Sequence, residues 1–242
     1  MNKTFCGIVF FFSLAALVCH GQGAKQDTVF LSSSVKNTKA LYEQWIGGQS
    51  RLYNGLATKG YSNDLDAEPY FAPDWEDGSV YYDDELYVNV PLMYDQITDK
   101  VVTSHFYSHS EIELISKKVD WFSILGHTFI HLGRDQSREA IPDGFYDLLH
   151  DGNVKLFAQR QKRIEEEIVM NKLTYQISAT NKYFIYKDGA FIPVKKKSSV
   201  LAALSDKKKE LQDYSKRNKL DFRKATETSI LQMVRHYDQA AK

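Results

Sequence analysis

Runs of aromatic and β-branched residues, separated by short turns that contain aspartate, recur between residues 80 and 192. Side chains of these types favour strands because they pack well on a pleated surface. Two of the turns, Asp151-Gly152 and Asp188-Gly189, accept the positive φ angles that a two-residue hairpin turn demands. A third, Asp83-Asp84-Glu85, separates two runs that contain tyrosine. The regular spacing predicts an antiparallel meander.

The expected strands are residues 80–82, 86–90, 101–103, 111–115, 128–130, 145–150, 153–157, 183–186 and 190–192. The sequence leaves open whether this meander stays an open sheet, curls toward a barrel or forms a sandwich. Residues 28–46 predict a short N-terminal helix. Amphipathic segments after Ser199 and Ser205, taken as N-caps, and over 226–240 predict a C-terminal helical pair. The expected fold class is therefore α+β.

The first residues have the layout of a secretory signal peptide. Lys3 is followed by an uncharged stretch from Thr4 to Ala24, which is most apolar over Ile8–Val18. We expect residues 1–23 to be removed by cleavage near Gly21–Gly23, and the protein to be exported to the periplasm, the outer membrane or the medium. No later segment is long and apolar enough to predict a membrane span in the mature chain.

Both cysteines, Cys6 and Cys19, fall within this leader, so the mature chain is expected to lack disulfides and thiolate metal sites. Behind the leader we expect a β-rich domain over 24–197, with the helices of 198–242 packed on the same domain.

Charge is distributed unevenly along a chain whose formal net charge is zero. Residues 24–151 carry 10 Lys and Arg against 21 Asp and Glu, and residues 152–242 carry 20 against 10. One interpretation is that the two halves attract each other inside one domain. The other is a basic C-terminal surface that binds an acidic partner, such as an envelope protein or an anionic surface. Nucleic acid is not an expected partner of an exported protein.

Three segments resemble an uncharacterised group of exported proteins from Bacteroidota. They are LYNG at 52–55, the stretch from PYFAPDW to LMYD at 69–95, and DKKKELQDYSKRNKLDF at 206–222. The resemblance implies export from a Gram-negative cell and a strand-rich body with a helical tail, and it implies no activity. The group has Asp-Gly in the turn after the first tyrosine strand, where this chain has Asp84-Glu85, so we expect a looser turn here.

His127 and His131 form a candidate metal pair because alternate residues of a strand share a face. Along one strand they would be ~13 Å apart, too far to share an ion without a bend. Thr128 stands where the zincin motif requires glutamate. The competing interpretation is two half-exposed polar residues of a strand.

A second candidate site combines aromatic and acidic residues. Trp75, Tyr81, Tyr82 and Trp121 could line a surface for a glycan or an apolar molecule, with nearby carboxylates to hold hydroxyl groups. The competing interpretation is a sheet face built from alternating tyrosines, with solvated acidic turns.

A third candidate is a basic face made of two lysine runs. These are Lys195, Lys196 and Lys197, followed by Lys207, Lys208 and Lys209. They could bind an anionic surface, or they could be a solvated helix face with local ion pairs.

The sequence contains no nucleophile motif and no phosphate-binding loop, and we expect no cofactor. We therefore favour a non-catalytic exported module that binds another envelope component. The alternatives are a ligand-binding β-domain for a glycan or an apolar molecule, and a periplasmic hydrolase or metal-dependent enzyme that uses His127 and His131.

Overall fold

The computed structural model describes residues 50–58, 60–61, 68–133, 141–169 and 172–240. The described residues all belong to one compact unit, Gly47–Lys242. The expected leader and the expected helix over 28–46 lie outside the described residues.

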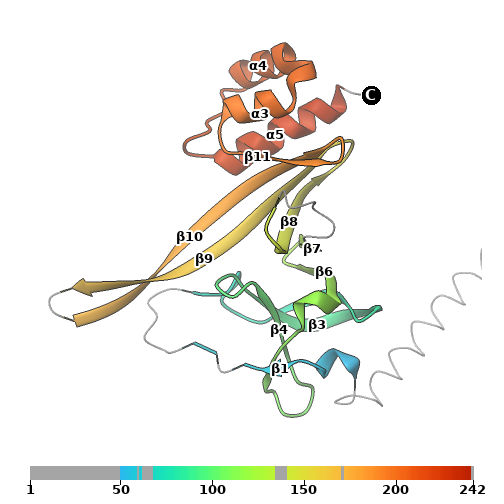
Figure 1. Ribbon diagram of the computed structural model, residues 1–242, viewed down its shortest axis with the longest axis vertical. Coiled ribbons are helices and arrows are strands. Elements are labelled where there is room, and N and C mark those ends of the chain that lie inside the picture. The colour runs from blue at the N-terminus through green and yellow to red at the C-terminus, as the bar shows by residue number, and fades with distance from the viewer. Residues whose placement is uncertain (1–49, 59, 62–67, 134–140, 170–171, 241–242) are drawn as a thin grey trace, which may run out of the picture. The chain divides into compact units, whose positions relative to one another are not determined.

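The described residues are mostly antiparallel sheet, as predicted (Figure 1). Eleven described strands follow the order β1-β5-β4-β3-β2-β6-β7-β8-β9-β10-β11. Their bounds are β1 Leu56–Ala57, β2 Glu76–Tyr82, β3 Glu85–Asp95, β4 Lys100–Ser104, β5 Glu111–Glu113, β6 Val119–Ile124, β7 His127–Leu132, β8 Gly144–Asp151, β9 Lys155–Val169, β10 Lys172–Lys187 and β11 Ala190–Val194. Because β1 and β11 end the order and do not pair with each other, the sheet is open and not closed into a barrel.

Two of the predicted turns are tight. Asp188 and Gly189 have φ angles of 51° and 79° and join β10 to β11, as the Asp-Gly signal indicated. Asp83 and Asp84 have φ angles of 52° and 64°, and Tyr82 pairs directly with Glu85. The turn in which we expected a looser connection is therefore a two-residue turn, shifted by one position from Asp84-Glu85.

The connection at Asp151-Gly152 is longer than predicted, because β8 ends at Asp151 and β9 begins at Lys155. Asp238 accounts for the difference. Its carboxylate accepts a hydrogen bond from the Val154 amide at 3.3 Å and lies 2.5 Å from His150 Nε2. This side chain from the last helix holds the turn open.

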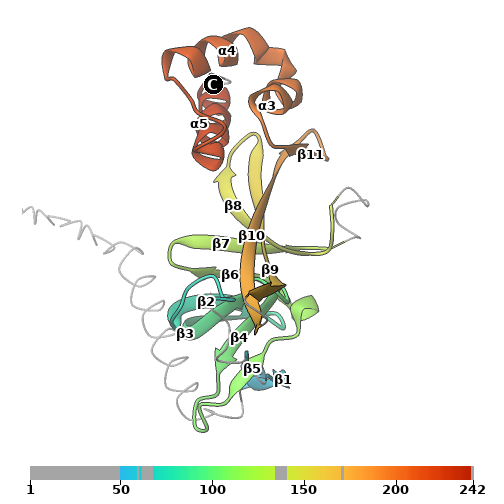
Figure 2. The same ribbon diagram turned by 90° about the vertical axis from the view of Figure 1, so that its left-hand side faces the viewer.

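Three α-helices follow the sheet, together with short 3-10 helices. Their bounds are α3 Lys197–Ala203, α4 Lys208–Arg217 and α5 Thr226–Gln239, with η2 Arg51–Tyr53, η3 Ser116–Lys118 and η4 Ser205–Lys207 as the 3-10 turns. Figure 2 shows the helices together at the end of the sheet that holds β8 and β11. The predicted N-caps were wrong. Lys196 and Lys207 occupy those positions, and Ser199 lies inside the first turn of α3.

The helices cover one face of the sheet. Even-numbered residues of β9, Leu156 and Ala158, pack with Leu204, Leu211 and Ile230 of the helical part. The odd-numbered Phe157 belongs to a separate cluster on the other face, as the alternation of a strand requires. A third cluster, rich in aromatic residues, lies among β2, β3, β6, β7 and β8.

Strands β9 and β10 extend beyond their neighbours (Figure 1). β8 pairs with β9 only as far as Ala158, and β11 pairs with β10 only from Tyr183. The last contacts to the body come from Lys162, whose amide donates to Gln96 O at 2.9 Å and whose ammonium donates to the carbonyls of Glu68 and Tyr70. Beyond it, residues 163–169 and 172–178 form a two-stranded ribbon, which we call the arm.

Candidate binding groove

A groove with a volume of about 710 Å³ lies where β11 ends and the chain leaves for α3. This volume is in the range of known ligand sites, about 300–1,000 Å³. Its lining comes from three segments: Thr180, Asn181, Lys182, Tyr183 and Phe184 of β10, Pro193 and Val194 of β11, and Lys195, Lys196 and Ser199 around the start of α3.

The groove follows the edge of β10. Consecutive residues of a strand point to opposite faces, yet all residues from Thr180 to Phe184 line it. A cavity over one face would be lined by alternate residues only. The groove is therefore the space beside the strand that β11 would fill if it continued past Val194.

The floor of the groove is apolar and its rim is basic. Tyr183, Phe184 and Val194 are buried, whereas Lys182 and Lys195 are exposed. The third rim lysine, Lys196, is exposed as well. An apolar floor supplies contact area, and charged groups at the rim select the sign of the occupant.

The three rim lysines, Lys182, Lys195 and Lys196, form no ion pair with a carboxylate in the described part of the chain. Other lysines do: Lys100, Lys118, Lys155 and Lys187. The rim therefore presents positive charge that the described residues leave unneutralised.

The backbone around two of the rim lysines is fixed by Ser199. Its hydroxyl oxygen accepts hydrogen bonds from the amides of Lys195 and Lys196 at 2.9 and 3.1 Å. The same hydroxyl donates to Lys196 O at 2.8 Å. This local network holds the turn between β11 and α3 and so sets the position of the basic rim.

The predicted basic face is divided between separate places. Lys195 and Lys196 line the groove, and Lys197 begins α3. Lys208 and Lys209 are exposed on α4. Lys182, which the sequence analysis missed, joins the groove because the pairing of β10 with β11 brings it beside the residues that follow β11.

Lys207 belongs to a cluster around Tyr237. Lys207 and Lys187 each place an ammonium 5.1 Å from the centre of the Tyr237 ring. The Tyr237 hydroxyl donates to Asp206 at 2.7 Å, and Lys187 donates to the same carboxylate at 2.5 Å. Burial lowers the pKa of Lys187, but the hydrogen bonds to Asp206 and Tyr237 outweigh it, and the pKa is raised. This lysine stays charged.

The four aromatic candidates do not share one surface. Tyr81 pairs with Trp121 across β2 and β6, so these two lie side by side on one face. Tyr82 points to the opposite face, is fully buried and donates its hydroxyl hydrogen to Asn54 O at 2.8 Å. Trp75 precedes β2 and is 37% exposed. Trp121 also lines a shallow pocket of about 570 Å³ with Asp120, Thr128, Ile130 and His131.

The two histidines contact different carboxylates. His127 Nδ1 lies 2.8 Å from Asp147 Oδ2, and His131 Nε2 lies 3.6 Å from Asp143 Oδ1. Among the residues that the structure describes, no three His, Cys, Asp or Glu side chains gather closely enough to hold a metal ion. A shared metal at these histidines stays a prediction.

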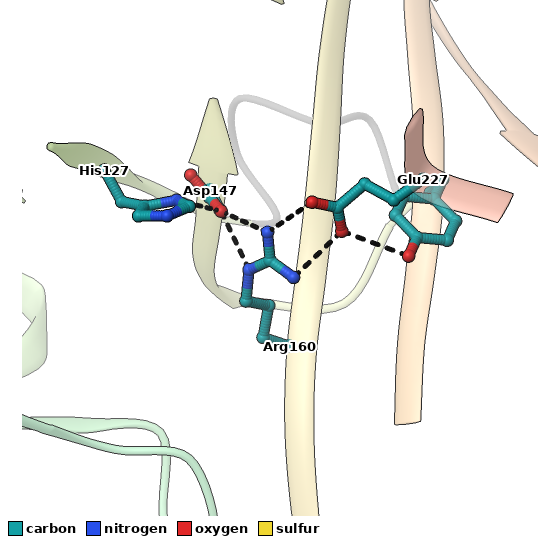
Figure 3. A network of polar contacts seen from close by, with 5 residues as sticks. His127, Asp147, Arg160 and Glu227 are labelled. Atoms are coloured by element: carbon teal, nitrogen blue, oxygen red, sulfur yellow. Dashed lines mark hydrogen bonds and ion pairs between the residues drawn. The ribbon is translucent and has the colours of Figure 1, made fainter. Parts of the chain in front are cut away.

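His127 belongs to a buried polar network that the sequence did not indicate (Figure 3). Arg160 donates to Asp147 Oδ2 through Nε at 2.8 Å and to both oxygens of Glu227 at 2.9 and 3.0 Å. Tyr183 donates to Glu227 at 3.1 Å. Burial lowers the pKa of Arg160, but its bonds to Glu227 and Asp147 outweigh this effect and raise it. The network ties the first turn of α5 to β7, β8 and β9.

In this network Asp147 orients the imidazole of His127, as a carboxylate does in a catalytic acid–base pair. Asp147 is only 1% exposed and fixes the His127 ring, whose side chain is 36% exposed. No hydroxyl or thiol of the described residues is hydrogen-bonded to His127, however. The other contacts of the ring are aromatic, to Phe71 and Phe129. The contacts of this network with Glu227 attach the first turn of α5 to the sheet.

Comparisons with protein-family models, with curated proteins and with solved structures found no match. Within the described residues, every helix is too short or too polar to cross a membrane.

Proposed function

We propose that this protein is an exported, non-catalytic interaction module that binds an acidic, extended segment of a partner in the groove beside β10. The proposal of export rests on the leader over residues 1–23. The proposal of binding rests on one observation above all, the groove along a free strand edge with Lys182, Lys195 and Lys196 at its rim.

An extended segment fits this groove because β10 offers an unpaired backbone edge. Residues 172–182 of β10 pair with β9 on one side and with no described strand on the other. A bound segment that runs in line with β11 would take up these hydrogen-bonding groups, as in other cases of strand addition. The apolar floor would contact alternate side chains of that segment.

The charge of the rim selects acidic segments. Each exposed ion pair contributes about 0.2–1 kcal/mol, so three lysines together contribute up to ~3 kcal/mol. Exposed pairs weaken as salt screens them. We therefore expect an affinity that depends strongly on salt, with backbone pairing as the component that salt does not remove.

The test uses fluorescent polyglutamate as the probe and the mature chain from Ala24 to Lys242. Binding measured by fluorescence anisotropy should weaken as salt is raised. In the Lys182→Glu, Lys195→Glu, Lys196→Glu triple variant the dissociation constant should rise by about tenfold or more.

The matched control carries the same change of charge elsewhere. Lys208, Lys209 and Lys216 are exposed on α4, and their reversal to Glu should leave the dissociation constant nearly unchanged. If both triple variants lose the probe equally, net charge accounts for binding and the groove does not.

A further inference from the structure

The groove beside β10 is closed at one end by β11. Pairing between the two strands begins with Tyr183, opposite Val194, so the edge of β10 is occupied from Tyr183 onward. The chain then leaves the sheet at Lys195 on its way to α3. A segment that enters from the side of the arm can therefore pair with β10 only as far as Lys182.

Positive charge is concentrated at this closed end. The three rim lysines, Lys182, Lys195 and Lys196, line the groove where β11 ends. The edge that leads to them is uncharged, because the sequence LTYQISATN from Leu173 to Asn181 contains no Lys, Arg, Asp or Glu. The groove therefore matches a segment that carries negative charge at the end which reaches the rim.

Negative charge lies beside the open end. Along β9 the charged residues up to Arg163 are cations, and the next three are Glu165, Glu166 and Glu167. These glutamates are exposed and pair with residues 174–176 of β10. Glu165 and Glu167 accept hydrogen bonds from neutral side chains of β10, which do not compensate their charge. The edge of β10 therefore runs from negative surroundings on the arm to positive surroundings at the rim.

We infer that the occupant of the groove is the C-terminal end of a partner chain, paired in parallel with β10 and with its α-carboxylate beside the rim lysines. This inference rests on the proposed function, since it identifies the acidic group that the same rim selects. An α-carboxyl group has a pKa of about 3.3–3.7 and an α-amino group one of about 7.7–8.0. Both ends of a short peptide are therefore charged at neutral pH, with the polarity that this edge requires.

A chain end fits the closed end of the groove better than an internal segment does. An internal segment would have to leave the plane of the sheet beside Lys182, because β11 occupies the edge from Tyr183 onward. Its backbone groups would lose their pairing there, and unpaired polar groups next to an apolar floor cost free energy. A chain that stops at the rim has no following residues to place.

The charges also set the direction of the bound segment. In the antiparallel direction its α-ammonium would lie beside three lysines and its α-carboxylate beside the glutamates of the arm. In a short segment, repulsion at both ends outweighs the slight advantage per residue of antiparallel pairing. The segment lies two strand spacings, ~10 Å, from β9, which is about one Debye length at 0.1 M ionic strength. The carboxylate at the rim therefore makes the stronger of the two end contacts.

The test compares one peptide with its capped forms. The probe is a nine-residue peptide of alternating threonine and serine, whose two chain ends are its only charges. It is long enough to reach from Lys182 to Thr174, which pairs with Glu167. Its inhibition constant is measured by displacement of fluorescent polyglutamate from the mature chain. Amidation of its C-terminus should raise this constant by about fivefold or more, and acetylation of its N-terminus by no more than about twofold. In the antiparallel direction both caps would lower the constant.

Neutral variants locate the effect of the carboxylate at the rim. In the Lys182→Gln, Lys195→Gln, Lys196→Gln variant, the free and the amidated peptide should bind equally, because the charges that distinguish them are gone. The matched control removes three exposed charges of α4 and should keep the full difference between the two peptides. It carries Lys208→Gln, Lys209→Gln and Lys216→Gln.

The two proposals fail in different ways. A peptide that does not displace polyglutamate overturns the capture of a C-terminal end, and so does amidation that lowers the inhibition constant or leaves it unchanged. An effect of amidation that persists in the neutral rim variant overturns it as well. Polyglutamate that binds the wild-type chain and is lost on reversal of the rim charges still supports the proposed function in each of these cases. Polyglutamate that does not bind the wild-type chain overturns both.

Discussion

Arg160 links the sheet to the helices through one guanidinium. It is 8% exposed and contacts Asp147 on β8 and Glu227 on α5. Because Asp147 is 1% exposed, its charge depends on this partner for compensation. The Oδ1 atom of Asp147 is buried and has no hydrogen-bond partner among the described residues, so the carboxylate has few other contacts to compensate for the loss of Arg160.

Replacing Arg160 with Met should therefore lower the free energy of unfolding by about 3–5 kcal/mol, since a buried carboxylate would lose its partner. Urea denaturation of the mature chain measures this loss. Arg163→Met is the matched control, because Arg163 is exposed on the arm, and it should change the free energy by less than about 0.5 kcal/mol. Equal losses in the two variants would show that the network does not stabilise the fold.

Two examples at the level of single residues show what the sequence analysis did not predict. A lone lysine at position 182 carries no signal, because its relation to Lys195 depends on where β11 ends. Tyr81 and Tyr82 were grouped as one aromatic surface, yet the period of two that predicted their strand already places them on opposite faces. Applying this period to the candidate site would have excluded Tyr82.

Strand turns were the most predictable elements. The Asp188-Gly189 turn and the pairing of Tyr186 with Phe191 beside it agree with the prediction, because a short Asp-Gly connection specifies its own backbone conformation. The Asp83-Asp84 turn has the same geometry with two non-glycine residues at positive φ. Positive φ costs most residues conformational energy that glycine avoids.

Asp84→Gly should therefore stabilise the protein by about 0.5–1 kcal/mol, because Asp84 has φ +64° and glycine adopts this conformation without steric cost. Thermal or urea unfolding of the variant measures the gain. Asp77→Gly, near the start of β2 and also exposed, should destabilise by a similar amount. A destabilising Asp84→Gly would mean that the aspartate side chain is needed in the turn.

The arm was the element that sequence analysis missed. The strands were predicted to end at residue 157 and to resume at 183, whereas β9 reaches Val169 and β10 begins at Lys172. The run Glu165-Glu166-Glu167 obscures the period of two in β9. A usable signal existed in β10, where Leu173, Tyr175 and Ile177 alternate with Thr174, Gln176 and Ser178.

The described residues separate into an aromatic part of the sheet and a basic, helix-covered end, and β8 contributes residues to both. The sequence predicted the antiparallel sheet and the C-terminal helices, since both follow from local periodicity. It could not predict the groove, because the groove arises from the unequal lengths of β10 and β11. Counting charge over the two halves of the sequence also did not reveal the acidic run Glu165-Glu166-Glu167 of the arm, because this run lies in the basic half.

The central claim is that the free edge of β10 accepts an acidic strand, and amide hydrogen exchange measures that edge directly. Added polyglutamate should slow the exchange of backbone amides within residues 174–182 of β10. Amides on the opposite side of the same strand already pair with β9 and serve as the internal reference. Exchange in 174–182 that is unchanged at saturating polyglutamate would contradict the claim.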